Sequence, residues 1–442
     1  MFFRRYGTFA GGIDLPDEKQ DTLGLAIESY KPADPLRVPL AVCGRSSAKP
    51  LVEPGQLVSL GERIAESCDS MSVDVFSPVA GKVVAVVSAE VAPVDRFVAC
   101  AVIEILPDKQ TVVLTEGDVS SDWQAFSPED LMDRIGAGGL TTYRRPIEPL
   151  VRWIDRARSK GCRALIANVM ENQPYVTADH RLLVERPTEV VDGLVMLASV
   201  LNIQEIALAV DWRRAPDYQG VVSPAKQRGI SLVALPHKYP AGSDAMVTKV
   251  ITRREKPPGG SVMDVGVAVV GAATCLATYR WVACGLPPIG RVVTVAGRRA
   301  ARAMNSWLPF GARCLSLVAD VEQPVIQNGP MVGVRCSSQG VISPATNAIL
   351  AIDASVPASP SPCIRCSWCT DHCPARLNVA ALNDAFELGA LDRASRLVAS
   401  GCLECGVCTY VCPARLPLSQ RVKYLKRAVM SGNSAMPLFA KG

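Results

Sequence analysis

Two runs of cysteine near the end of the chain constrain its fold more than any other feature. The first run is Cys363, Cys366, Cys369 and Cys373, followed by Pro374. The second is Cys402, Cys405, Cys408 and Cys412, followed by Pro413. Two-residue spacers let one tight loop present three thiolates to a cubane cluster, while the fourth cysteine of each run ligates the other cluster. The spacing therefore predicts two [4Fe–4S] clusters and an electron-transfer protein.

This exchange of ligands assigns all eight cysteines. The first cluster is expected on Cys363, Cys366, Cys369 and Cys412, and the second on Cys402, Cys405, Cys408 and Cys373. Structural zinc usually takes four ligands as two spaced pairs, so two complete runs make zinc the weaker interpretation. Helical periodicity at Leu382, Phe386, Leu391 and Leu397 predicts a helical cluster domain rather than a compact βαβ ferredoxin.

The other eight cysteines are scattered singly, mostly among apolar neighbours: Cys43, Cys68, Cys100, Cys162, Cys275, Cys284, Cys314 and Cys336. A secreted disulfide protein is usually much shorter and carries a cysteine framework throughout. We therefore expect these eight to be buried, reduced thiols in an intracellular protein.

Length and charge narrow the function further. A chain of 442 residues predicts roughly three domains. Its net charge of +5 is too small for a nucleic-acid-binding footprint. The longest apolar run, Val265 to Tyr279, is shorter than the roughly 18–20 residues that span a bilayer, and a buried strand–helix unit explains it better. Neither a targeting segment nor a spanning helix is expected, so any membrane contact should be peripheral.

Residues 1–106 have the pattern of a small all-β module. Short alternating runs at 36–40, 81–87 and 101–105 are separated by turn signals. The halves at 51–58 and 76–83 resemble the barrel-sandwich fold of biotinyl and lipoyl carriers. A carrier needs a lysine at the hairpin tip, and the tip from Ser67 to Asp74 has none. The module is therefore interpreted as structural or docking. A polar linker is expected over 107–127.

Helix and strand signals alternate through the middle of the chain. Helices are expected at 146–159 and 189–201, and strands at 163–168, 205–210 and 231–235. This alternation is typical of an α/β sheet covered by helices. Strand-and-turn character returns over 291–350, and a Pro/Ser linker at 355–362 precedes the cysteine region.

The chain resembles the RnfC family, the C subunits of the Rnf electron-transport complex, a ferredoxin:NAD oxidoreductase that pumps ions. The resemblance covers nearly the whole length, in the same order. It is carried by 8–19, by Tyr239-Pro240-Ala241-Gly242, by the segments 264–269, 291–297 and 328–333, and by the two cysteine runs. Each piece alone is a weak signal, and the ordered set is specific.

The resemblance implies a multidomain fold of α/β and β parts. Its domains would be a barrel-sandwich hybrid at 1–106, an FMN/NADH-type α/β domain like the flavoprotein of complex I at 128–288, a β-grasp domain at 289–350 and a dicluster ferredoxin domain at 360–430. It also implies other Rnf-type subunits and ferredoxin or a similar carrier as partners, no nucleic acid, and a peripheral place on the cytoplasmic side of the membrane.

The sequence departs from the family where flavin and NADH would bind. The resemblance points to Gly136, Gly138, Gly139, Asn168 and Glu171 as cofactor-binding residues. The family's loop continues Ala-Gly-Phe-Pro-Thr, whereas this chain continues with residues 140–145, Leu-Thr-Thr-Tyr-Arg-Arg. Each Cβ added there hinders the approach of backbone N–H groups to a phosphate. The second glutamate of the family's Asn-x-x-Glu-Cys-Glu-Pro-Tyr motif is Gln173 here.

Three hypotheses follow from this departure. The chain is an electron relay with a weakened flavin/NADH site, an active NADH/FMN oxidoreductase subunit, or a soluble enzyme like the cobalamin reductase of bacterial microcompartments. That reductase begins directly with the Gly-rich loop, so the leading β-module favours the Rnf-type subunit. No catalytic residue is assigned.

Overall fold

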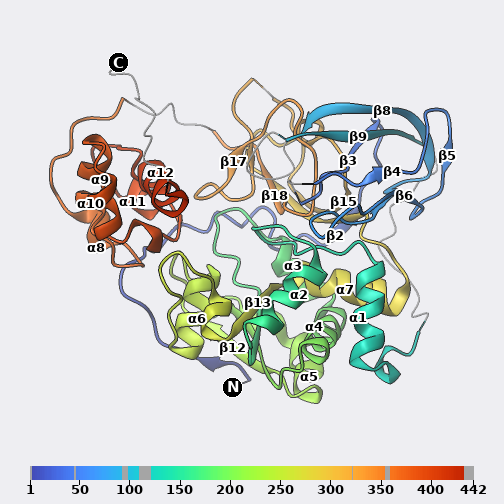
Figure 1. Ribbon diagram of the computed structural model, residues 1–442, viewed down its shortest axis with the longest axis horizontal. Coiled ribbons are helices and arrows are strands. Elements are labelled where there is room, and N and C mark those ends of the chain that lie inside the picture. The colour runs from blue at the N-terminus through green and yellow to red at the C-terminus, as the bar shows by residue number, and fades with distance from the viewer. Residues whose placement is uncertain are drawn as a thin grey trace.

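The computed structural model describes residues 2–43, 46–91, 98–108, 121–320, 322–353 and 359–432 (Figure 1). In the described part of the chain, no helix is both long enough and apolar enough to cross a bilayer. Most of the linker expected at 107–127, and much of that at 355–362, lies outside the described residues.

A parallel five-stranded sheet forms the centre of the α/β part, in the order β1-β12-β11-β10-β13. The strands are β1 (Arg4–Arg5), β10 (Ala164–Asn168), β11 (Glu205–Asp211), β12 (Ser231–Leu235) and β13 (Val267–Gly271). The predicted strands at 163–168, 205–210 and 231–235 are confirmed to within one residue. The chain steps from β10 outward to β12 and then returns to the other side of β10 as β13, so the strand order reverses between β10 and β13.

Helices pack around this sheet (Figure 1). They are α1 (Pro128–Ala137), α2 (Leu150–Ser159), α3 (Ala178–Glu185), α4 (Pro187–Leu201), α5 (Gln219–Gln227), α6 (Asp244–Thr252) and α7 (Ala272–Cys284). The apolar run at 265–279 is indeed a strand–helix unit, β13 and α7. The helix predicted from residue 146 begins only at Leu150, because the preceding residues pair in extended form with 140–142: Thr142 N–H donates to the Glu148 carbonyl and Leu150 N–H to that of Leu140, both at 2.9 Å.

Two small sheets build the β-module. One has the order β3-β9-β8-β5 and the other β4-β6-β7. Their strands are β3 (Leu36–Pro39), β4 (Lys49–Pro50), β5 (Leu57–Val58), β6 (Arg63–Glu66), β7 (Val75–Phe76), β8 (Gly81–Val91) and β9 (Val98–Pro107). Inward side chains such as Ile103 share one hydrophobic core with Val293 and Leu308 of the six-stranded sheet described below. The module is thus fused to that sheet.

A mixed six-stranded sheet follows, in the order β17-β16-β18-β14-β15-β2. Its strands are β2 (Ile27–Ser29), β14 (Gly290–Ala296), β15 (Met304–Pro309), β16 (Ile326–Gln327), β17 (Val334–Arg335) and β18 (Ala348–Leu350). The central strand β14 runs antiparallel to β15 and parallel to β18.

The cysteine region is helical, as the periodicity predicts, and lies at one end of the molecule (Figure 1). Its helices are α8 (Trp368–Asp371), α9 (Val379–Glu387), α10 (Leu391–Arg396), α11 (Val407–Tyr410) and α12 (Leu418–Ser431). The apolar faces of α9 and α12 meet in a small core that contains Leu382 and Leu425, both fully buried.

The N-terminal segment, residues 2–29, runs through three of these parts. Its strand β1 adds to the edge of the α/β sheet, pairing Arg4 with Val233. Gly12 N–H then donates to the His372 carbonyl of the helical domain (2.8 Å), and β2 pairs in parallel with β15. The β-module itself therefore starts at β3, and the domain boundary 1–106 stays a prediction.

The scattered cysteines are free thiols, in agreement with the expectation of reduced cysteine. Cys43, Cys100, Cys275, Cys314 and Cys336 are buried, and Cys162 and Cys284 are partly buried. Cys68 is exposed, because it lies in the hairpin tip between β6 and β7, where no core packs against it. Burial is therefore confirmed for most of the set and wrong for Cys68.

Two asparagines tie the end of β10 to the loop that precedes α6. Asn168 is buried, and its Nδ2 donates to the Gly242 carbonyl (3.0 Å) and to Asp244 Oδ1 (2.9 Å). The side-chain oxygen of Asn172 accepts from Ala241 N–H (2.9 Å) and Gly242 N–H (3.0 Å). Asn168 thus donates hydrogen bonds to this loop, and Asn172 accepts hydrogen bonds from it.

The two asparagines should respond oppositely to an isosteric change. Asn168→Asp places a carboxylate against two acceptors, so we expect the free energy of unfolding at pH 7.5 to fall by about 3 kcal/mol. Asn172→Asp keeps both acceptor bonds and should change it by less than about 1 kcal/mol. Chemical denaturation measures both. The gap between the variants should narrow at pH 5, because a protonated carboxyl at position 168 regains a donor; equal stabilities at pH 7.5 would contradict this assignment.

Candidate functional site

The two cysteine runs form a structural repeat. Residues 363–377 and 402–416 correspond position by position, and both end in Cys-Pro-Ala-Arg-Leu. Helix α8 occupies the same place in the first as α11 in the second. The left-handed backbone positions also recur: Arg365 (φ 59°) matches Glu404 (φ 58°), and Arg376 (φ 56°) matches Arg415 (φ 55°).

These left-handed residues matter because L-amino acids adopt that conformation at a cost of about 1–2 kcal/mol. Alternation of right- and left-handed residues turns successive N–H groups into a concave anion site, a geometry found around iron–sulfur centres. Two such N–H groups point at ligand sulfurs here: Leu377 N–H lies 3.4 Å from Cys373 Sγ, and Glu404 N–H lies 3.3 Å from Cys402 Sγ. The loops therefore suit negatively charged clusters bound by thiolates.

The structure brings Cys373 to the second run. The pKa of the Cys405 thiol is raised to about 12, first by burial and then by the nearby Cys402 and Cys373. The pKa of Cys408 is also raised, first by burial and then by Cys405, Cys402 and Cys373. These four thiols are the set expected for the second cluster, and we call them the inner thiol group.

Cys412 correspondingly lies near the first run. Burial raises the pKa of Cys369, and Cys412 and Cys366 add to that effect. We call Cys363, Cys366, Cys369 and Cys412 the outer thiol group, since Cys366 is exposed. Among the described residues, no three Cys, His, Asp or Glu side chains are arranged to hold a metal ion. In a cubane cluster, by contrast, each thiolate binds its own iron.

A lysine places positive charge beside the inner thiol group. Lys426 Nζ donates to the Cys402 carbonyl (2.9 Å) and to Glu404 Oε1 (2.8 Å). Lys423 pairs with the other oxygen of Glu404 at 3.1 Å. Nothing in the cysteine spacing indicates Lys426, because it comes from α12, beyond the second run.

The three loop glycines do not form an open phosphate cradle. Gly138 and Gly139 follow the C-terminal end of α1. A Cβ on Gly138 would lie 2.5 Å from the Trp281 indole, and one on Gly139 would lie 2.4 Å from the Asp74 carbonyl oxygen. The space that these glycines leave is therefore filled by the protein itself. Gly136 alone faces open space, in a cavity of about 550 Å³ between α1, α2 and the hairpin tip at 67–74.

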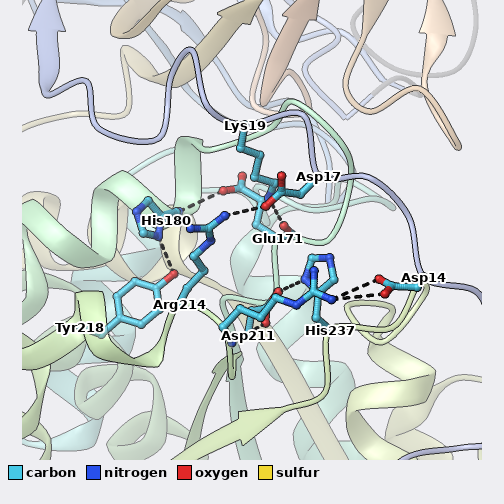
Figure 2. A network of polar contacts seen from close by, with 10 residues as sticks. Asp14, Asp17, Lys19, Glu171, His180, Asp211, Arg214, Tyr218 and His237 are labelled. Atoms are coloured by element: carbon cyan, nitrogen blue, oxygen red, sulfur yellow. Dashed lines mark hydrogen bonds and ion pairs between the residues drawn. The ribbon is translucent and has the colours of Figure 1, made fainter.

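Glu171 belongs to a polar network at the carboxyl ends of β10, β11 and β12 (Figure 2). Its carboxylate accepts from the backbone N–H groups of Asp179 and His180, both at 3.1 Å, and so caps α3. The buried ammonium of Lys19 donates to the Glu171 carbonyl. The pKa of Glu171 is raised to about 7, first by burial and then by Asp179, against the opposing charge of Lys19.

The rest of this network is also internally paired (Figure 2). Arg214 Nη2 donates to Asp17 (2.5 Å), and His237 Nδ1 bonds with Asp211. His180 Nδ1 lies 2.7 Å from the Tyr218 hydroxyl, and burial lowers the pKa of His180 to about 3. Asp14, which accepts from Arg213 Nη2 (3.3 Å), lies in the N-terminal segment with Asp17 and Lys19, so the network joins that segment to the sheet.

Arg144 occupies the crevice where the strand order reverses. Asn168 and Gly271 are the last residues of β10 and β13, and ligands of open α/β sheets bind at such a point. A Cβ on Gly271 would lie 2.7 Å from Arg144 Cδ. The guanidinium of Arg144 donates to Asp244 Oδ1 (2.9 Å) and to the Gly242 carbonyl (3.2 Å). The chain's own side chain thus occupies part of the crevice and lines the cavity of about 250 Å³ beside it.

The five predicted flavin/NADH residues are therefore not brought together. Gly136 and Gly139 line the 550 Å³ cavity, whereas Glu171 lines a separate cavity of about 250 Å³, and Asn168 makes three internal hydrogen bonds. Their assignment as cofactor-binding residues stays a prediction.

The 250 Å³ cavity adjoins the inner thiol group. Cys405 lines it together with Arg144, Gln173 and Tyr239. The Tyr239 hydroxyl donates to the Cys405 carbonyl (2.6 Å), and Gln173 Nε2 donates to that hydroxyl (3.0 Å). Gln173 Oε1 accepts from Met331 N–H (3.2 Å). The amide thus donates and accepts at once, whereas an ionised glutamate could only accept.

Three family models match the chain in sequence order. The RnfC barrel sandwich hybrid domain matches residues 7–110, the Nuo51 FMN-binding domain matches 147–280, and a 4Fe-4S dicluster domain matches 362–417. The match to the FMN-binding domain begins after the altered glycine loop. The barrel-sandwich, FMN-binding-type and dicluster parts of the expected fold are thus present.

Curated relatives match most of the chain. The C subunit of the ion-translocating oxidoreductase complex of Pseudomonas aeruginosa is 30% identical over 86% of this chain and 51% of its own length. The C subunit of the proton-translocating ferredoxin:NAD(+) oxidoreductase complex of Clostridium ljungdahlii is 28% identical over 85% of this chain and 84% of its own. The chain thus spans about half of the first relative and most of the second.

A solved NAD+-reducing [NiFe]-hydrogenase superposes with a TM-score of 0.45 and 16% identity, covering 69% of this chain and 55% of that one; a likeness of this size adds nothing to the assignment. The assignment rests on the ordered domain models, on the relatives and on the paired cysteine loops. By these criteria the chain carries the RnfC barrel sandwich hybrid domain and is similar, over most of its length, to the C subunits of ion-translocating oxidoreductase complexes.

Proposed function

We propose that this chain is an electron-relay subunit of a membrane-bound, Rnf-type ion-translocating complex. The outer and inner thiol groups would each hold one [4Fe–4S] cluster, which accepts and donates single electrons when bound. Two relatives that match most of their own length, those of Clostridium ljungdahlii and Rhodobacter capsulatus, are named as C subunits of such complexes.

The observation that carries the proposal is the placement of the two thiol groups. The outer group includes an exposed thiol, Cys366, whereas Cys405 of the inner group lines the cavity beside the α/β sheet. A relay needs one end open to a partner and the other directed into the protein. The hydrogen bonds from Gln173 to Tyr239 and from Tyr239 to Cys405 fix the inner group against that cavity.

The flavin/NADH site is weakened under this proposal. Arg144 occupies part of the crevice, Trp281 and Asp74 fill the space beside the loop glycines, and Glu171 is used as a helix cap. The second candidate, an active NADH/FMN subunit, is favoured by the match of the FMN-binding domain to residues 147–280. A soluble enzyme like cobalamin reductase is the least favoured, since residues 7–110 match the RnfC barrel sandwich.

The proposal keeps the four-domain division 1–106, 128–288, 289–350 and 360–430, with a β-grasp fold for the third. Support for the β-grasp comes from the central strand β14, which lies between an antiparallel hairpin partner, β15, and the parallel last strand, β18. In this arrangement the helix of a β-grasp is reduced to the 3₁₀ turn Cys314–Leu317.

Partners and location complete the proposal. The other subunits of the complex would hold the chain peripherally on the cytoplasmic side of the membrane, and ferredoxin or a similar carrier would exchange electrons with it. The ferredoxin partner is supported by the name of the Clostridium ljungdahlii complex.

The cluster assignment predicts about eight irons per chain in anaerobically purified protein, and interacting [4Fe–4S] signals in its EPR spectrum when reduced. Cys373→Ser should damage mainly the inner cluster and Cys412→Ser mainly the outer one, because those ligands are exchanged between the runs. Cys68→Ser, an exposed thiol outside both groups, is the control and should keep all the iron. One zinc per run, or loss of the outer signal in Cys373→Ser, would refute the assignment.

The weakened flavin site predicts well under one FMN per chain after reconstitution, and no NADH-dependent dye reduction. The same preparation should still take electrons from reduced ferredoxin. Flavin fluorescence after denaturation and dye assays measure both properties. Stoichiometric flavin together with NADH turnover would replace the relay by the active NADH/FMN subunit.

A further inference from the structure

The internal repeat allows one half of the helical domain to be compared with the other. Because 363–377 and 402–416 correspond, the loop at 364–368 is the counterpart of the loop at 403–407. Each loop wraps the three closely spaced thiols of its run. We call 364–368 the outer loop and 403–407 the inner loop.

The inner loop is packed against the rest of the protein. The Tyr239 hydroxyl bonds to the Cys405 carbonyl (2.6 Å), and a Cβ on Gly406 would lie 2.6 Å from the Met331 carbonyl oxygen. Val407 is fully buried in a cluster with Leu15 and Tyr239. No residue of the inner loop is highly exposed. This face is thus an intramolecular docking surface at the inner thiol group.

The outer loop has no such cover among the described residues, and all five of its residues are exposed. Ile364 is 64% exposed and Trp368 53% exposed, whereas Val407, the counterpart of Trp368, is 0% exposed. Cys366, the counterpart of Cys405, lies between these two apolar side chains in sequence and is itself exposed. The only charge within the outer loop, Arg365, is paired with Asp384 Oδ2 at 2.8 Å.

We infer that the outer loop is the docking surface for a protein electron carrier, which covers it as the body of the chain covers the inner loop. This inference rests on the proposed relay function and assigns the relay's open end. Exposed tryptophan and isoleucine in a small patch provide anchors of the kind that dominate protein interfaces. Transient redox complexes bury little area, so an exposed loop of this size can serve as the centre of such an interface.

The position of the thiols favours a redox protein over other possible occupants of the outer loop. Cys366 lies within the loop, so any protein seated on Ile364 and Trp368 sits directly over the outer thiol group. A membrane surface or a second copy of this chain would also cover apolar side chains, and the experiment separates these occupants. The loop's net charge is nearly neutral through the Arg365–Asp384 pair, so docking should depend only weakly on salt.

The test compares two electron donors on the holoprotein. A reduced two-[4Fe–4S] ferredoxin is the protein donor, and reduced methyl viologen is a small donor that needs no docking surface. Stopped-flow spectroscopy follows cluster reduction in wild type, Ile364→Ser, Trp368→Ala and Trp368→Phe. Leu388→Ser is the matched control, since Leu388 is a 72% exposed apolar residue after α9. Iron content and EPR spectra establish that each variant retains both clusters.

We expect the second-order rate with ferredoxin to fall at least tenfold in Ile364→Ser and Trp368→Ala, to recover largely in Trp368→Phe, and to stay unchanged in Leu388→Ser. The viologen rate in each variant reports whether its clusters remain reducible. Equal ferredoxin rates in wild type and loop variants would overturn the inference. So would a loop substitution that changes the sedimentation coefficient or the flotation with anionic vesicles instead of the ferredoxin rate. A wild type that lacks iron, or that neither donor reduces, would refute the relay function itself.

Discussion

The N-terminal segment holds the parts of this protein in register, because its residues pair with three of them in turn. Strand β1 extends the α/β sheet, Gly12 bonds to His372 in the helical domain, and β2 extends the six-stranded sheet. Between the latter two contacts, the ammonium of Lys19 is buried in the polar network of Figure 2. A buried charge is stable only with partners in good geometry, so this path has few alternatives. Two glycines restrict the path further. A Cβ on Gly11 would lie 2.6 Å from the Cys373 carbonyl oxygen, and one on Gly12 would lie 2.6 Å from that of Tyr239.

The contacts of the N-terminal segment hold the helical domain with its inner loop against the rest of the protein. Cys405 of the inner thiol group lines the cavity beside β10, whereas Cys366 of the outer thiol group is exposed. A pair of sequence repeats thereby acquires two different environments. Lys426 and the Tyr239 hydroxyl act only on the inner group, where hydrogen bonds and nearby positive charge are factors that set reduction potentials.

The sequence predicts those features that depend on neighbours along the chain. Strands β10, β11 and β12 follow from short apolar runs, and cysteine spacing suffices to group Cys373 with the second run, because paired cubane loops exchange their fourth ligands. The start of α2 is harder to predict from the sequence, because residues 146–149 bond to 140–142 instead of beginning the helix. A glycine, likewise, indicates free space beside the backbone but not that Trp281, Asp74 or Arg144 fills it. In both cases the structure is decided by contacts that the local sequence pattern does not show.

The course of the N-terminal segment also bears on how the protein is made. Residues 2–29 leave the ribosome well before their partners, since β1 has no partner until Val233 and Ala234 have been synthesised and Gly12 has none until His372 has appeared. Domains generally fold as units during synthesis, whereas such long-range pairings must wait. The α/β sheet therefore gains its edge strand late, and the helical domain joins the body later still. Both thiol groups are then still open to solvent when their loops first form, so iron and sulfide can be delivered to the inner group before docking encloses it.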